Sequence, residues 1–223
     1  MGLDASVFYT HFNNRIIGDF DTHPDQIIYQ NLNGYAVSKG LTFNMELSHS
    51  SGFKGMAGVT FQDVSYINGS VKQQQVLTES FSGTWTLSYK FNLLNLTLDY
   101  TGNLYGPMQL PLAGKLDPRS RISPWWSIQN IQLSYELGKR FSIYGGIKNL
   151  LNFTPDRHTS FLIARANDPF DKKVEYDAVG QIKATAANPY ALTFDPNYIY
   201  APNQGRRGVV GIRMTIHRSG SDD

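Results

Sequence analysis

Four side chains in loop-like stretches are the chain's candidates for binding a small solute. Arg119 and Arg121 lie in "LDPRSR", and Arg157 and His158 lie in "TPDRHTS". Cations gathered at one end of a protein raise the local concentration of an anionic solute. Arginine is also common on ordinary solvated surfaces, so the pattern leaves that second interpretation open.

A second group of ligand-type residues surrounds His23 in "DFDTHPDQ". It lacks the glycine and the distal glutamate of a calcium-binding EF-hand loop, so we expect a solvated polar loop and no metal site. The chain contains no G-x-S-x-G motif and no cysteine, which excludes thiolate metal ligands and a catalytic thiol. We therefore predict neither an enzyme nor a bound cofactor.

The overall composition is that of a folded protein with no affinity for nucleic acid. Charged residues make up 17% of the 223 residues and aromatic residues 13%, the reverse of a disordered chain. The formal net charge of +2 gives no basis for binding nucleic acid. No run approaches the ~18 consecutive apolar residues of a membrane-spanning helix. The mean hydropathy of −0.32 is still compatible with membrane strands, in which polar and apolar residues alternate.

Most of the chain alternates between apolar and polar residues, which predicts β-strands. In "FSGTWTLSYKF" every second residue is apolar or glycine, and the intervening ones are serine, threonine or lysine. About eight such stretches occur, each of roughly ten residues, which is longer than soluble strands and matches strands that cross a membrane. They cover residues 5–16, 35–48, 53–66, 81–91, 94–104, 125–137, 141–153 and 206–217.

The connections between these stretches alternate between short and long. "HSSG", the residues around Asn92 and "GKR" are short enough for hairpin turns. Residues 17–33, 68–80, 107–123 and 154–205 form the long connections. Outer-membrane barrels have this asymmetry, with short turns on the periplasmic side and long loops outside.

Alternation alone does not say which way the apolar face points. The polar strand positions are mostly Ser, Thr, Asn and Gln, and aromatic residues lie at several strand ends, as in the aromatic girdle of a membrane barrel. We therefore predict a lipid-facing surface and a lumen-facing one. On the lumen-facing surface the expected cations are Lys39, Lys90, Lys148 and Arg213, with Glu46, Asp99 or Glu136 as partners. The predicted lipid-facing residues are Trp85, Leu87, Tyr89, Leu96, Leu98, Ile131, Leu133, Ile143, Ile212 and Met214.

Three segments carry a resemblance to a known family. They are "ISPWWSIQNIQLSYEL", "SIYGGIKNLLNFTP" and "NQGRRGVVGIRMTI", and the start of the chain, "ASVFYTHFNNRIIGDF", fits the same pattern. In this order and spacing they resemble the C-terminal part of the barrel of TonB-dependent outer-membrane receptors, in phrasing common among Bacteroidetes.

The resemblance implies an all-β fold: an antiparallel transmembrane β-barrel segment of about eight long meander strands. The family's barrel has about 22 strands and holds a plug domain. Residues 1–223 are then expected to be a C-terminal barrel segment without the plug and the N-terminal barrel strands. Residues 217–223 form a polar tail where such barrels usually end on an aromatic residue.

The function implied is that of a receptor and transporter fragment in the bacterial outer membrane. The solute is expected to be a ferric siderophore or a similar iron or cofactor complex arriving from outside. The partners implied are outer-membrane lipid, the missing barrel and plug, and the TonB complex acting through that plug. Two alternatives remain open: a standalone eight-stranded barrel with an adhesive or structural role, and a soluble β-sandwich that binds carbohydrate.

Overall fold

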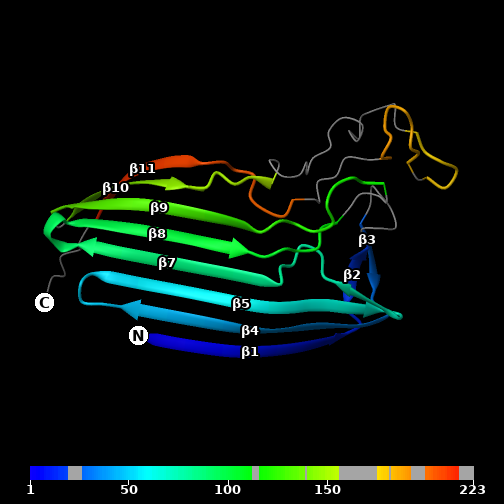
Figure 1. Ribbon diagram of the computed structural model, residues 1–223, viewed down its shortest axis with the longest axis horizontal. Coiled ribbons are helices and arrows are strands. Elements are labelled where there is room, and N and C mark those ends of the chain that lie inside the picture. The colour runs from blue at the N-terminus through cyan, green and yellow to red at the C-terminus, as the bar shows by residue number, and fades with distance from the viewer. Residues whose placement is uncertain are drawn as a thin grey trace, which may run out of the picture.

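The chain forms one large antiparallel sheet in which chain order and sheet order agree (Figure 1). The computed structural model describes residues 1–19, 27–111, 116–138, 140–155, 175–180, 182–191 and 199–215. The eight long strands are β1 (Gly2–Asn13), β4 (Gly34–Ser48), β5 (Phe53–Asn68), β7 (Phe81–Phe91), β8 (Leu96–Tyr105), β9 (Trp126–Leu137), β10 (Phe141–Lys148) and β11 (Arg207–Met214). The predicted fold class, an antiparallel all-β meander, is confirmed.

Four short elements complete the described structure. β2 (Ile16–Asp19) and β3 (Ile28–Asn31) form a separate hairpin, and β6 (Val71–Gln74) adds to part of β5. These three lie within connections that the sequence analysis treated as loops. A 3-10 turn, Asn92–Leu94, joins β7 to β8 and ends at Asn95, which has a left-handed backbone.

Short and long connections lie at opposite ends of the sheet (Figure 1). We call the end with residues 49–52, 92–95 and 138–140 the turn end, and the other the loop end. His49 and Phe53 are joined by a backbone hydrogen bond of 2.9 Å, which closes the first of these turns. The asymmetry expected from the sequence is therefore present in the sheet.

One continuous apolar face runs across all eight long strands. Residues directly opposite each other in an antiparallel pair point to the same side of the sheet. Leu87 is opposite Tyr100, Tyr100 is opposite Ile131, and the same row continues to Ile147. By this register all ten residues predicted to face lipid share one side, which we call the apolar face; the other side is the polar face.

Large side chains on the apolar face remain uncovered. Leu87 is 38% exposed and Val210 is 84% exposed. The buried apolar residues of the described structure gather in two clusters near the loop end, on the polar face. No second sheet covers the apolar face within the described residues, so the structure does not form the sandwich considered above.

The sheet is open. β1 and β11 each pair with one long strand and stand at the two ends of the strand order, so in the described structure they do not pair with each other. The closed eight-stranded barrel is therefore not formed. Unpaired strand edges are costly inside lipid, which makes both edges surfaces for further strands.

Strand ends and one charged residue differ from the prediction. The strand predicted over 141–153 ends at Lys148, because Asn149 takes a left-handed backbone with a φ of 52°. The prediction that Lys39 lies among the lumen-facing residues is wrong. Lys39 is opposite Tyr9 and Asp63 on the apolar-face side, near the loop end. Lys90 and Glu136 do share the polar face, where their charged groups approach to 3.0 Å.

One close contact on the apolar face needs a glycine. Gly102 is opposite Trp85, whose indole ring lies over it. A Cβ at position 102 would sit 2.3 Å from Cζ2 of Trp85, closer than any real contact. The ring therefore uses the space that the glycine leaves open.

We predict that Gly102→Ala lowers the free energy of unfolding by about 1–3 kcal/mol, because the added methyl group collides with the Trp85 ring. The measurement is the urea midpoint of the chain folded in detergent micelles. The matched control is Gly208→Ala on the same face, where a Cβ meets nothing within 4 Å. Equal midpoints for the two variants would contradict the predicted collision.

Candidate functional site

The β2–β3 hairpin folds over the polar face at the loop end. Ile17 and Leu32 are buried against Ala36, and Tyr66 packs beside them. Ala36 and Tyr66 are opposite each other on the polar face of β4 and β5. The apolar side of the hairpin therefore holds it across the polar face, so that its polar residues border a cleft.

This cleft has a volume of about 520 Å³ and a mainly polar lining. Its walls come from the hairpin, from β5 and β6, and from residues 109–111 and Arg121 in the connection between β8 and β9. The Tyr66 hydroxyl donates a 2.6 Å hydrogen bond to Oε1 of Gln73, which joins β5 and β6 at the wall. The polar side chains that line the cleft include Arg15, Gln30, Tyr66, Gln73, Gln109 and Arg121.

Two arginines and one aspartate give the cleft its charge. Arg15 lies in the link between β1 and β2, with its guanidinium 5.9 Å from the centre of the Phe12 ring. Arg121 enters from the connection between β8 and β9, and its carbonyl accepts a 2.8 Å hydrogen bond from Leu110. Asp19 is the acidic residue in the lining. The balance is positive, which suits an anionic ligand.

The four sequence candidates have different outcomes. Arg121 lines the cleft, whereas Arg119 does not. Arg119 is buried, and its Nε donates hydrogen bonds of 3.0 Å to both carboxylate oxygens of Asp117. A buried pair of this kind neutralises its own charge, so Arg119 serves to shape the connection. Arg157 and His158 lie outside the described residues, as does His23.

Sequence reasoning missed Arg15. Its segment, "NNRIIG", looked like the end of the first strand. In the structure β1 ends at Asn13, and Asn14 has a left-handed backbone with a φ of 53°. Asparagine tolerates that conformation better than most residues, and the "NN" pair was the available signal for a chain reversal.

An aromatic cluster lies beyond the cleft on the same face. The rings of Tyr105 and Trp126 stack with centroids 4.3 Å apart, and Phe153 stacks on Trp126 at 5.9 Å. Tyr200 is buried in this cluster, and its burial raises the pKa of the phenol above its ordinary value. The phenol therefore stays neutral, and Tyr200 and Ala201 are held against Trp126 of β9 and Tyr105 of β8.

Asn149 links the beginning and the end of the connection between β10 and β11. Its Nδ2 donates hydrogen bonds to the carbonyls of Phe153 (2.7 Å) and Gln204 (2.8 Å). Its Oδ1 accepts a 2.9 Å hydrogen bond from the backbone N–H of Phe153. Nearby, Oδ1 of Asn152 accepts a 2.8 Å hydrogen bond from the backbone of Arg206. The segment "NLLNF" is thus a structural clamp at the loop end.

Metal ligation finds no support in the described part of the chain, where no group of three or more His, Cys, Asp or Glu residues is placed to hold an ion. None of the helices in that part is long and apolar enough to cross a membrane.

A family model described as "TonB dependent receptor-like, beta-barrel" matches residues 1–150, which is more than half of the chain. The chain belongs to this family of TonB-dependent receptor β-barrels. Family members are receptors and transporters of the bacterial outer membrane rather than enzymes, so this chain is an outer-membrane β-barrel segment. No curated protein matches the chain.

Solved receptors share the fold of this segment. The ferric-catecholate import receptor Fiu from E. coli is 12% identical, with a TM-score of 0.58, and the match covers 96% of this chain and 25% of that receptor. A variant of the ferric enterobactin receptor PfeA from Pseudomonas aeruginosa is 16% identical, with a TM-score of 0.52 and coverages of 96% and 29%.

A third solved receptor matches a smaller part of the chain. It is the outer-membrane ferripyoverdine receptor of Pseudomonas aeruginosa, solved with ferripyoverdine bound. It is 18% identical, with a TM-score of 0.51 and coverages of 68% and 21%. The chain therefore spans about a quarter of the length of the solved receptors that it matches.

We predict that Asn149→Ala lowers the free energy of unfolding of the receptor segment by about 3 kcal/mol, because it removes three buried hydrogen bonds and leaves alanine in a left-handed backbone. The specific measurement is hydrogen exchange at the Phe153 amide, whose acceptor is lost. Its exchange is expected to accelerate.

The matched control is Asn14→Ala. Asn14 has nearly the same φ, 53° against 52°, but it is exposed and carries no side-chain hydrogen bond in the described structure. The control is expected to cost about 1 kcal/mol for the backbone alone. An equal loss of unfolding free energy in both variants would show that the hydrogen bonds of Asn149 do not contribute to stability.

Proposed function

We propose that residues 1–223 form the C-terminal wall of a TonB-dependent receptor barrel, and that the loop-end cleft contributes to its solute entrance. The observation that carries this proposal is the pair Arg15 and Arg121 in a polar cleft on the polar face of a family barrel sheet. The solute class proposed is an anionic ferric siderophore. In support, the fold is shared with receptors for ferric catecholates, ferric enterobactin and ferripyoverdine.

The proposal assigns the two faces of the sheet. The apolar face meets outer-membrane lipid, because its large side chains are exposed on seven of the eight long strands and partly exposed on β8. The polar face lines the lumen, and the hairpin β2–β3 narrows its outer mouth. Aromatic residues at the turn end support this orientation: the rings of Tyr89 and Phe91 pack at 4.7 Å on the apolar-face side, where a girdle is expected.

Uptake requires parts that this chain does not supply. In the family, import depends on a plug domain and on TonB, and the proposal assigns the same partners to the complete receptor. The open edges at β1 and β11 are where the other barrel strands would pair. The chain's own contribution is then a section of wall, its outer loops and one side of the entrance.

The lipid-facing assignment predicts strong quenching of Trp85 fluorescence by brominated lipid acyl chains. The chain has three tryptophans, at positions 85, 125 and 126, so variants that each keep a single tryptophan isolate the signal. Trp85 is on the apolar face, and Trp126 is buried on the polar face. We expect quenching of Trp85 and little quenching of Trp126 in reconstituted vesicles. Quenching of Trp126 alone would reverse the two faces.

The solute assignment predicts that Arg15→Gln and Arg121→Gln each weaken the binding of ferric enterobactin about tenfold, the scale of one lost charged hydrogen bond. Binding is measured by fluorescence titration of the reconstituted chain, with ferric enterobactin as the anionic probe. Added salt should weaken binding to the unsubstituted chain more than to the variants.

The matched control is Arg140→Gln. Arg140 is exposed at the turn end, which is the end of the sheet opposite the cleft. If all three variants bind equally, the cleft is not the solute entrance. If Trp85 is nevertheless quenched by brominated lipid, the assignment of the faces stands and only the solute assignment fails.

A further inference from the structure

Two lysines share one carboxylate on the apolar-face side of the sheet. Nζ of Lys72 is 3.4 Å from Oδ2 of Asp63, and Nζ of Lys39 is 3.9 Å from the same oxygen. The side chains of Lys39 and Lys72 are 56% and 58% exposed, and that of Asp63 is 30% exposed. The group carries a net charge of +1, and both ammonium groups retain donors that face solvent.

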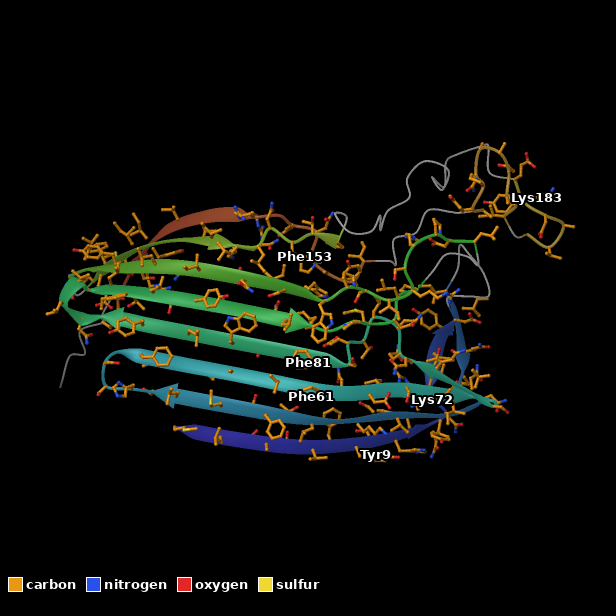
Figure 2. All side chains as sticks on the ribbon, in the orientation of Figure 1. Tyr9, Phe61, Lys72, Phe81, Phe153 and Lys183 are labelled. Atoms are coloured by element: carbon orange, nitrogen blue, oxygen red, sulfur yellow. The ribbon has the colours of Figure 1, made fainter. Side chains whose placement is uncertain are left out.

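This group lies at the border of the apolar face. Asp63 is two residues beyond Phe61 on β5, and Lys39 is two residues beyond Leu41 on β4, each about 7 Å further toward the loop end. Figure 2 shows Lys72 beyond Phe61 and Phe81 in that direction. Lys39 and Asp63 therefore lie one row beyond Leu41 and Phe61, and Lys72 lies nearer the loop end, opposite Ile67.

Aromatic rings mark the same border. Phe61 and Phe81 pack edge to face with centroids 5.1 Å apart, and Phe81 contacts Trp125 at 5.4 Å. Tyr9 is opposite Lys39 and is exposed beside it on β1. Aromatic residues prefer the boundary between hydrocarbon and headgroups, and lysine stems extend from that depth to place the ammonium in the polar layer.

We propose that Lys39 and Lys72 bind the phosphate of a lipid headgroup at the outer border of the lipid-facing surface. The proposal rests on the proposed function in one respect, the orientation of the apolar face toward lipid. The ligand is a lipid rather than a free phosphate, because the two lysines continue an uninterrupted apolar and aromatic surface. Asp63 positions both ammonium groups and also limits the strength of binding, since its own charge repels the phosphate.

This role of Asp63 provides the test. The two interpretations, a purely structural ion pair and a headgroup site, predict different effects of Asp63→Asn on the binding of anionic lipid. If the group is only structural, the substitution should not strengthen that binding. Removing the carboxylate raises the net charge of the group from +1 to +2, so a headgroup site should bind more tightly. Each charge near a membrane surface changes binding about fivefold.

The experiment measures energy transfer from Trp125 to dansyl-labelled phosphatidylglycerol, with dansyl-labelled phosphatidylcholine as the neutral reference, in vesicles containing the full chain. Trp85 and Trp126 are replaced by phenylalanine to isolate the donor. We expect Asp63→Asn to raise the preference for phosphatidylglycerol about fivefold, and the double variant Lys39→Gln and Lys72→Gln to abolish it. The control is Lys90→Gln, which breaks a lysine–carboxylate pair on the polar face and should change nothing.

Three outcomes would overturn the proposal. The first is an unchanged or lower preference in Asp63→Asn, and the second is an equal loss in Lys90→Gln. The third is an energy transfer that shows no preference for phosphatidylglycerol over phosphatidylcholine but is reduced by inorganic phosphate, with the reduction lost in the double lysine variant. That result would indicate a free-phosphate site. If brominated lipid quenches Trp85 in the separate variant that keeps only Trp85, but the lysine variants have no effect on energy transfer, the headgroup site alone is rejected. Absence of Trp85 quenching rejects the orientation on which both proposals depend.

Discussion

The structure depends on a register that carries one apolar surface across eight strands. Because side chains alternate along a strand, a slip of one residue in any strand would move its leucines to the polar face and its serines and threonines to the apolar face. The row through Leu87, Tyr100, Ile131 and Ile147 shows how closely neighbouring strands are matched. Lipid enforces the same match, because backbone groups within it need partners from adjacent strands.

The loop end is organised by a different interaction. There the polar face acquires two small apolar cores, one under the β2–β3 hairpin and one around Trp126. These cores hold otherwise irregular connections in place, and the side chain of Asn149 adds hydrogen bonds between the two ends of the connection from β10 to β11. The cleft lined by Arg15 and Arg121 exists because the hairpin packs inward across the mouth. Local burial on the polar face thus positions the residues that the proposed function uses.

The sequence was sufficient for the strands and their faces, since a period of two over ten residues leaves little ambiguity. The sequence was insufficient for short elements and buried side chains whose positions depend on contacts with other parts of the fold. The hairpin β2–β3 has only four residues in each strand, too few for a pattern, and is held by Ala36 of β4 and Tyr66 of β5. The burial of Arg119 against Asp117 depends on the fold of its connection, which composition does not reveal. Lys39 was misplaced because its charge suggested the lumen, although it has the same alternation as Val37 and Leu41 and therefore lies on their side of the strand.

The two ion-pair groups show why position along a strand matters as much as the side that a residue faces. Lys90 and Glu136 pair on the polar face near the turn end, and each forms one ion pair within the described residues. Lys39, Lys72 and Asp63 lie on the other side near the loop end, where two positive charges share one carboxylate. The first group is neutral, so its charges are balanced without a further ligand. The second retains a positive charge directly above an aromatic border, at the depth where an outer-membrane barrel meets the headgroups of its lipid. The imbalance of charge, rather than the presence of an ion pair, is what distinguishes a surface suited to an anionic partner.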